Sequence, residues 1–322
     1  MAITANQSVL TLDYWKAARH LQVGDWVFDK DGKPTRITLV QQYYAEECYE
    51  VLFTDHLTVS GDKRLSFQVE NEVYRKKIQD YQNIRKFRRP LKFLSIEALL
   101  ELNLIGRKRG HEYSLPTTKP LEFPAQTLGI PPFVFGFWFL NRRPKGKYSA
   151  RTDFVISKFK AAGYKIETIE PQHFKTTPVI EHQLAPNIPN KIPTNYLMAS
   201  VEERIELLSG LVNSKKSQYN VKTDWFRITS VSLRPMQQIQ GLVESLGCKS
   251  QIKYDDTQEY YTLFFKCKHK LIPNQESKPA KVHLARRYIK EIKQIAPQMV
   301  VHIETEGENN SILVAEGFIA TC

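Results

Sequence analysis

This 322-residue chain contains no long apolar run and no CxxC motif, and its first residues do not have the pattern of a secretory leader. No stretch of about 20 apolar residues occurs, which argues against a membrane-spanning helix and predicts no membrane partner. The four cysteines are too few and too scattered for a disulfide framework, and no CxxC pair indicates zinc. Residues 1–7 lack a basic end followed by an apolar segment, so we expect an intracellular protein of the cytoplasm or nucleus.

Acidic residues are also in short supply, because 34 Asp and Glu residues face 46 Lys and Arg residues, giving a formal net charge of +12. This excess suits a polyanionic partner such as nucleic acid, although a basic protein that is merely soluble would show it too. Apolar residues make up 42% of the chain and charged residues 25%, so we expect a buried core. The length predicts two domains, or one domain with a large insertion.

Short strand patterns separated by turn residues occur at both ends of the chain. Asp31-Gly32 and Gly61-Asp62 are turn signals between such segments. The expected strands are 8–11, 26–29, 36–42, 49–53, 57–60, 65–69, 299–305 and 311–315. This texture predicts a compact all-β unit.

The centre of the chain differs, because helical patterns alternate there with strand patterns. Ser95 is expected to cap one helix, and prolines punctuate 116–132, which predicts a linker. The expected helices are 95–104, 201–212 and 234–246, and the expected strands are 225–231 and 263–265. Domains accept insertions at exposed loops, and an inserted domain has its ends close together. We therefore expect a β module interrupted by an α/β module.

The β segments at the two ends resemble the Hint fold of inteins and hedgehog autoprocessing domains. The residues that carry this resemblance are Val9-Leu10-Thr11, Trp15, 21–28 with Asp31-Gly32, 302–305 and 312–319. The middle resembles a LAGLIDADG homing endonuclease. One copy of its helix motif lies at 134–141 and the second at 207–214, preceded by Ile192-Pro193 and Tyr196-Leu197.

The resemblance covers nearly the whole chain and rests on the order and spacing of these motifs. It implies an α+β protein in which an all-β Hint domain is interrupted by an α/β LAGLIDADG endonuclease-like domain. The implied Hint domain is 1–95 plus 275–322, the linker 96–124 and the endonuclease-like domain 125–274. Gly136 and Gly210 retain the family's small packing residues, so the two motif helices should pair closely.

An intein needs nucleophilic and acid–base groups at a few positions, and most of these carry unexpected residues here. The family's first nucleophile corresponds to Ala2, which has none. Its Thr-x-x-His motif corresponds to Ser60-Gly61-Asp62-Lys63, so Lys63 stands where a His is expected, unless it is simply a solvated turn lysine.

The family's closing His-Asn pair has two possible registers in this sequence. In one register the pair falls on Thr321 and Cys322, and in the other Cys322 takes the His position and the Asn lies outside the sequence. Neither register completes the pair. His302, where many members have an Asp, is either a base or a partly buried structural histidine.

In the endonuclease family each motif helix ends in an acidic residue, and the two carboxylates hold Mg²⁺. The corresponding residues here are Asn141 and Asn213, followed by Arg142-Arg143 and Lys215-Lys216. Amides bring no charge, and neighbouring cations repel Mg²⁺ but attract phosphate. We therefore expect the endonuclease fold without a metal site or other cofactor.

Double-stranded DNA is the predicted partner, together with flanking host protein segments if the chain is an intein. The segment 75–89 is either a DNA-contacting arm or a solvated helix face. The residues expected to contact DNA are Arg75, Arg85, Arg88, Arg89, Lys222, Arg227, Lys266 and Lys268. The predicted function is an intein-type element that has lost splicing and cleavage. The alternatives are a free-standing DNA-binding protein that reuses the scaffold, and an engineered splicing-inactive precursor of an active intein.

Overall fold

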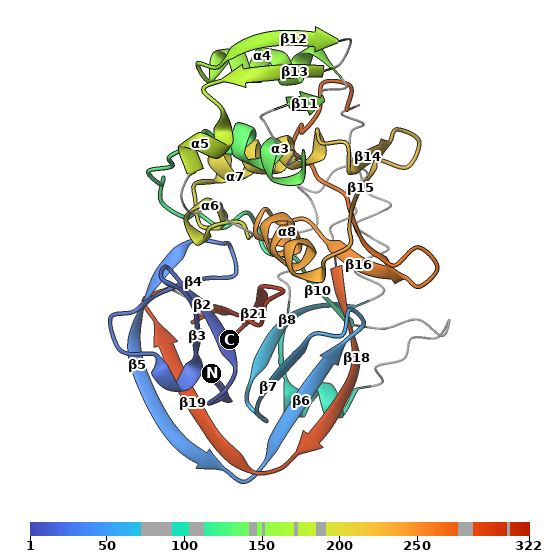
Figure 1. The fold of residues 1–322 in the computed structure, drawn as a ribbon. Helices are drawn as coiled ribbons and strands as arrows, with labels where there is room; N and C mark the ends of the chain where they lie inside the picture. Colours follow the sequence, from blue (N-terminus) through green and yellow to red (C-terminus); the bar gives the residue numbers. More distant parts are fainter. Residues whose placement is uncertain are drawn as a thin grey trace, which may run out of the picture. The chain divides into compact units, whose positions relative to one another are not determined.

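The computed structural model describes residues 1–71, 92–102, 113–141, 147–149, 152–170, 173–184, 191–275, 286–307 and 310–322. The chain forms two compact units, which we call unit 1 (Met1–Glu122 with Ala280–Cys322) and unit 2 (Phe123–Pro279). Unit 1 consists almost entirely of strands, whereas unit 2 mixes helices and strands (Figure 1). This is the α+β arrangement expected from the sequence, with an α/β unit inserted into a β unit. In the described part of the chain, no helix is long and apolar enough to span a membrane.

The strands of unit 1 pair in one continuous 14-stranded arrangement, and β10 pairs with both β18 and β8. The strands are β1 (Ala2–Thr4), β2 (Ser8–Thr11), β3 (Tyr14–Ala17), β4 (Trp26–Phe28), β5 (Pro34–Ala45), β6 (Cys48–Phe53), β7 (Thr58–Asp62), β8 (Ser66–Asn71), β9 (Lys92–Ser95), β10 (Tyr113–Pro116), β18 (Arg286–Ile295), β19 (Gln298–Thr305), β20 (Ile312–Val314) and β21 (Ile319–Thr321). Among its described residues, unit 1 also contains two short helices, η1 (Ala18–His20) and α2 (Ile96–Leu100).

Segments from the two ends of the chain interlock in unit 1. The long strand β5 pairs antiparallel with β19 (Figure 1). Strand β1 pairs with β19 on one side and with β7 on the other. The turn at Asp31-Gly32 joins β4 to β5 as predicted, and Gly32 adopts φ +80°, which residues with a Cβ rarely adopt. The N-terminal and C-terminal parts of the chain therefore build one core.

The segment 96–124, expected to be a linker, contributes α2 and β10 to unit 1 instead of only connecting the two units. Ser95 caps α2 as predicted, accepting a hydrogen bond from the backbone N–H of Ala98 at 3.1 Å, but this helix ends at Leu100 and not at 104. Ile96, Leu99 and Leu115 are buried in the core of unit 1. Their burial explains why the segment folds with the β unit.

Unit 2 contains two separate antiparallel sheets and a set of packed helices. Its strands are β11 (Lys147–Ser149), β12 (Lys165–Glu170), β13 (His173–Thr177), β14 (Ser217–Asn220), β15 (Trp225–Ser230), β16 (Ser250–Asp255) and β17 (Tyr260–Phe265). Its helices are α3 (Pro132–Asn141), α4 (Asp153–Ala161), α5 (Ile180–Leu184), α6 (Thr194–Leu197), α7 (Val201–Val212) and α8 (Leu233–Ser245). The sheet orders are β11-β13-β12 and β14-β15-β17-β16.

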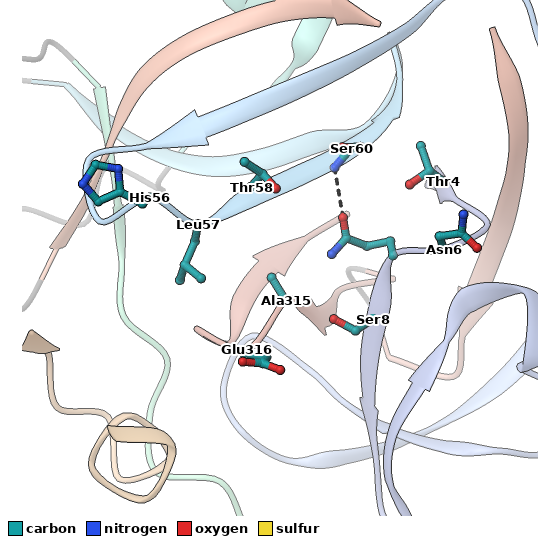
Figure 2. Close-up of a pocket in the computed structure, with 10 residues that line it drawn as sticks. Thr4, Asn6, Ser8, His56, Leu57, Thr58, Ser60, Ala315 and Glu316 are labelled. Carbon is teal, nitrogen blue, oxygen red and sulfur yellow. Dashed lines mark hydrogen bonds between the residues drawn. The ribbon is translucent and has the colours of Figure 1, made fainter. Parts of the chain in front are cut away.

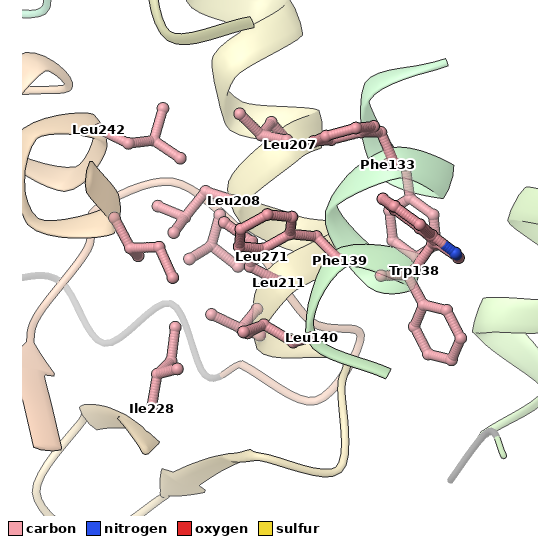
Figure 3. Packing of buried hydrophobic residues seen from close by; sticks show 14 of the residues in the cluster. Phe133, Trp138, Phe139, Leu140, Leu207, Leu208, Leu211, Ile228, Leu242 and Leu271 are labelled. Atoms are coloured by element: carbon pink, nitrogen blue, oxygen red, sulfur yellow. The ribbon is translucent and has the colours of Figure 1, made fainter. Parts of the chain in front are cut away.

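The core of unit 2 is organised around α3 and α7. Helix α3 buries every residue from Phe133 to Leu140, so it has no polar face. Helix α7 begins with a capping box in which Ser200 and Glu203 each accept a hydrogen bond from the other's backbone N–H. Aromatic and aliphatic side chains from α3, α7 and the neighbouring sheet fill the space around the pair (Figure 3).

Candidate functional site

The two motif helices, α3 and α7, approach closely because each presents a glycine to the other. A Cβ added to Gly136 would meet the carbonyl oxygen of Leu207, and one added to Gly210 would meet the carbonyl oxygen of Phe133. The obstructing atoms are backbone atoms, which cannot rotate away. The predicted close pairing of the motif helices is therefore present.

Asn141 and Asn213 lie at the C-terminal ends of these helices, where the family resemblance places its carboxylates. The Asn141 Nδ2 donates to the carbonyl oxygen of Phe137 at 2.9 Å. The Asn213 Nδ2 donates to the carbonyl oxygens of Ser209 at 2.8 Å and Leu271 at 3.1 Å. Both amides thus act as hydrogen-bond donors that satisfy carbonyls of the last helical turn.

The rest of this region does not fit Mg²⁺ either. The Asn141 Oδ1 accepts a hydrogen bond from the backbone N–H of Lys215 at 3.2 Å. Lys215 and Lys216 are exposed beside the helix ends, whereas Arg142 and Arg143 lie outside the described residues. Nowhere in the described ranges do three or more His, Cys, Asp or Glu side chains gather in a way that could hold a metal ion. Magnesium needs anionic oxygen ligands, and here the motif positions offer amide donors instead.

We predict that Asn141→Asp and Asn213→Asp each destabilise unit 2 by about 1–3 kcal/mol, with the larger effect at Asn213. An ionised carboxylate cannot donate to these carbonyls, and its charge is unfavourable at a helix C-terminus. Urea unfolding measures the loss. Asn220→Asp is the matched control, because the Asn220 Oδ1 accepts from the backbone N–H groups of Lys222 and Thr223, as a carboxylate also can. Equal stability of all three variants would contradict this interpretation of the amides.

In unit 1, the predicted splicing positions Ala2, His302 and Ser60 lie on neighbouring strands. Ala2 is buried in β1 directly opposite His302 of β19. The next residue, Ile3, is opposite Gly61 of β7, beside Ser60. The His302 Nε2 lies 3.1 Å from the Glu304 Oε1, and the His302 side chain is partly buried. The structure thus brings these three positions together around β1.

Lys63 lies in the turn after β7 and pairs with Glu47. Its Nζ lies 2.8 Å from the Glu47 Oε2, and its side chain is nearly half exposed. The hydrogen bond to Glu47 and the charge of this carboxylate raise the pKa of Lys63. Lys63 therefore stays protonated at neutral pH.

The remaining positions are Thr321, the last residue of β21, and Cys322, which follows it. The fully buried Thr321 hydroxyl donates to the Ile312 carbonyl at 3.5 Å and lies 3.4 Å from the Met1 sulfur. The backbone of Cys322 exchanges two 2.9 Å hydrogen bonds with Ser66. Burial raises the pKa of the Cys322 thiol to about 12, which keeps it protonated. Its sulfur is accordingly a weak nucleophile.

A buried charged cluster next to Ser60 was missed by the sequence analysis. Asp62 is buried, and its carboxylate accepts hydrogen bonds from the Tyr43 hydroxyl at 2.7 Å and from the Arg64 Nε at 2.9 Å. Burial and the Asp62 carboxylate raise the pKa of Tyr43 to about 12. The prediction of a turn at Gly61-Asp62 is wrong, because both residues belong to β7 and the turn follows at Lys63 and Arg64. The ion pair fixes the β7–β8 turn.

A polar cavity of about 420 Å³ lies in the same unit (Figure 2). At one wall, the Gln7 Oε1 accepts a hydrogen bond from the backbone N–H of Ser60 at 3.0 Å. The lining residues are Thr4, Asn6, Gln7, Ser8, His56, Leu57, Thr58, Ser60, Ala315 and Glu316. Ser60 is the one predicted splicing position among them, so this cavity is not where those positions converge.

The four-stranded sheet of unit 2 presents a basic, partly aromatic face. Phe226 and Ile228 of β15 point into the core, which leaves Trp225, Arg227 and Thr229 on the other face. The register places Lys253 of β16 on that outer face as well, opposite Thr262 of β17. Lys266 lies 5.4 Å from the centre of the Trp225 ring. We call Trp225, Arg227, Lys253 and Lys266 the basic face.

The other predicted DNA contacts are distributed differently. Lys222 lies in the turn between β14 and β15, and Lys268 is exposed just beyond β17. Arg75, Arg85, Arg88 and Arg89 lie outside the described residues. The structure therefore places Arg227, Lys253 and Lys266 on one surface, whereas the role of the 75–89 segment stays a prediction.

Comparison with known proteins gives one curated relative over nearly the whole chain. It is the replicative DNA helicase DnaB of Mycobacterium intracellulare, 23% identical over 333 residues, with a match covering 95% of this chain and 56% of that protein. The chain thus spans about half the length of this relative. No family model matches the chain.

Solved structures similar to the chain include the MchDnaB-1 intein, with 10% identity and a TM-score of 0.32, covering 99% of this chain and 98% of that one. I-DmoI, solved in complex with DNA and Mn, covers 43% of this chain and 89% of its own, with 15% identity and a TM-score of 0.29. A β unit of this chain is interrupted by a unit whose two motif helices pair through glycines. In this organisation and in the order of its motifs, the chain resembles inteins of the Hint fold that carry a LAGLIDADG homing-endonuclease domain.

Proposed function

We propose that this protein is an intein-type element that retains both scaffolds and a duplex-DNA-binding surface, but performs neither splicing nor DNA cleavage. The observation that carries the proposal is the pair of amides at the ends of α3 and α7. Each donates hydrogen bonds to helix carbonyls instead of offering an anionic oxygen to a metal. These residues cap their helices and leave the position without cleavage chemistry.

DNA binding is supported by the basic face of unit 2. Arg227 and Lys253 project from a sheet surface, with Lys266 stacked over Trp225 at its edge. Cations on such a surface bind phosphates with release of counterions, and an exposed aromatic ring adds apolar contact. The net charge of +12 favours association with a polyanion.

The cluster around β1 lacks the groups that splicing requires. Ala2 offers a methyl group where an attacking oxygen or sulfur is needed. Lys63 is held as a cation by Glu47, so it cannot accept the proton that a neutral histidine would take. His302 is hydrogen-bonded to Glu304 and lies opposite Ala2. If the His302 imidazole accepts a proton, it has no nucleophile at position 2 to activate.

An engineered precursor explains these features less well. Replacement of one nucleophile to trap a splicing intermediate would account for Ala2. It would not account for Asn141 and Asn213, which lie in the other unit and are integrated into helix ends by their amide hydrogens. Changes at both centres are consistent with loss or reuse of the element.

We predict no ligated product when this chain is expressed between two reporter proteins. The physical reason is the missing nucleophile at Ala2 together with the charged lysine at 63. Gel analysis with mass determination of every band measures the result. The same fusion carrying Ala2→Cys, Lys63→His, Thr321→His and Cys322→Asn asks whether the scaffold still positions a restored set of groups. Ligated reporters from the unmodified fusion would overturn the proposal for unit 1.

A further inference from the structure

Cys248 and Cys267 face each other at the base of the β16–β17 hairpin in unit 2. The register pairs Ser250 with Phe265 as the last partners of these strands. Continuing that register by two residues places Cys248 opposite Cys267 on the same, inward face of the sheet. Directly opposite residues of antiparallel strands have Cα atoms about 4.5–5.5 Å apart, which is within the range that disulfides span.

The two thiols are buried and influence each other's ionisation. The exposed fraction is 5% for Cys248 and 4% for Cys267, and each thiol is the largest influence on the other's pKa. The hydrogen bond from Cys267 lowers the pKa of Cys248, and the backbone N–H and charge of Lys268 act in the same direction. The same hydrogen bond and burial raise the pKa of Cys267. The Cys248 thiol is thus the more acidic of the pair.

We propose that Cys248 and Cys267 form an oxidisable dithiol that low-molecular-weight disulfides convert into a cross-strand disulfide. The described residues around the pair do not include a third ligand arranged for a metal ion, so metal binding is not the better explanation. The remaining cysteines, Cys48 and Cys322, belong to unit 1 and do not compete for this bond.

The reaction proceeds by two exchange steps. When the end of the hairpin opens locally and exposes the buried pair, the Cys248 thiol loses its proton to water. Its thiolate attacks one sulfur of oxidised glutathione, forming a mixed disulfide and releasing one glutathione thiolate. Cys267 then loses its proton to water and attacks the Cys248 sulfur, which expels the second glutathione thiolate. The protein loses two electrons and two protons, and the oxidant is reduced to two thiols.

The disulfide links the chain before β16 to the chain after β17, at the end of the hairpin opposite its turn. The loop from Cys248 to Cys267 contains β16 and β17, and a cross-link across it restricts the unfolded chain. Lys253 and Lys266, both part of the basic face, lie within this loop. If unit 2 binds DNA as proposed above, oxidation also rigidifies part of that surface. This last consequence rests on the proposed function, whereas formation of the bond does not.

The test is equilibration of the full chain with defined ratios of reduced and oxidised glutathione, followed by alkylation and peptide mapping. We expect loss of two hydrogens, a peptide pair joined through Cys248 and Cys267, and a rise in the melting temperature of unit 2 of about 5 °C. Cys248→Ser and Cys267→Ser should each abolish both changes, whereas Cys48→Ser with Cys322→Ser should leave both intact.

Free alkylation of both thiols after oxidation, or a cross-link mapped to another pair, would overturn the proposal. The mapping needs no variant, so poor folding of a serine variant does not affect the result. Duplex affinity measured before and after oxidation reports separately on the basic face. A disulfide without any effect on DNA would refute the rigidification and leave the dithiol assignment standing.

Discussion

Gly136→Ala and Gly210→Ala are each expected to destabilise unit 2 by about 3 kcal/mol, and the double variant is expected to lose its cooperative unfolding transition. A Cβ at Gly210 would lie against the Phe133 carbonyl oxygen and 2.7 Å from the Phe137 backbone nitrogen. At Gly136 it would lie against the Leu207 carbonyl oxygen and 3.1 Å from the Leu211 nitrogen. Because these are backbone atoms, α3 and α7 must separate to admit the methyl groups.

The separation would be costly because the two helices organise the core of unit 2. Phe135 and Trp138 of α3, and Leu208 and Leu211 of α7, are fully buried in that core. The side chains around this helix pair interdigitate closely (Figure 3), so parting the helices opens space that no side chain fills. The two substitutions act on one interface, and their effects are not expected to add.

Gly241→Ala is the matched control for the helix glycines. Gly241 also lies within a helix, α8, but an added Cβ meets no atom within 4 Å. Alanine should therefore leave stability unchanged or raise it by up to about 1 kcal/mol. Urea denaturation followed by circular dichroism compares the three variants. If Gly136→Ala and Gly210→Ala behave like Gly241→Ala, the helices are not held in contact through their glycines.

Much of this fold could be predicted because its periodic segments follow ordinary rules. The helix at 201–212 begins with a capping box, and the structure gives α7 the same bounds. The first part of β5 alternates buried and exposed residues, and the second part of β19 alternates buried and partly buried residues. Helix α3 is different, because it is apolar on all sides, so the spacing of its apolar residues does not indicate a helix rather than a strand. Its motif resemblance, not its periodicity, identified it.

Strand β18 was not predicted, and the reason is electrostatic. It begins with Arg286 and Arg287, which look like surface residues in a sequence. In the structure both are buried. Arg286 pairs with Glu70 at 2.5 Å and Arg287 with Asp55 at 2.6 Å. Their partners lie more than 200 residues earlier in the chain, so no local pattern could reveal that these charges are compensated.

At the candidate sites, too, the sequence shows which residues are present but not which contacts they form. The replacement of carboxylates by Asn141 and Asn213 is visible in the sequence, but the direction of their amides is not. An asparagine can offer an oxygen or donate a hydrogen, and only the position of the Phe137, Ser209 and Leu271 carbonyls decides between these roles. The buried contacts of Asp62 depended in the same way on Tyr43, a residue from another strand.

Unit 2 is expected to bind duplex DNA through the basic face, with an affinity that falls steeply between about 50 and 200 mM salt. Replacing Arg227, Lys253 and Lys266 with Ala should reduce the salt slope by up to about three, if each contacts one phosphate. The matched control replaces Lys33, Lys290 and Lys293 with Ala. These exposed lysines belong to unit 1, so the control removes the same charge from outside the basic face.

The bound duplex is expected to remain intact. Hydrolysis of a phosphodiester needs a metal or an equivalent group to stabilise charge on the attacking and leaving oxygens. The helix ends supply amide donors and the Lys215 backbone instead. Asn141→Asp with Asn213→Asp should not create strong cleavage, because the exposed Lys215 and Lys216 still disfavour a divalent cation there.

The most direct measurement combines both properties in one experiment. The protein is incubated with a plasmid library in the presence of Mg²⁺ or Mn²⁺ at about 50 mM salt. Plasmid bound to the protein is separated from free plasmid, and the ends of any linear DNA are sequenced. We expect the unmodified protein and the unit 1 control to bind plasmid equally well, and the basic-face variant to bind it more weakly. Every recovered plasmid is expected to be uncut. A defined cut site that disappears when a chelator is added would contradict the account.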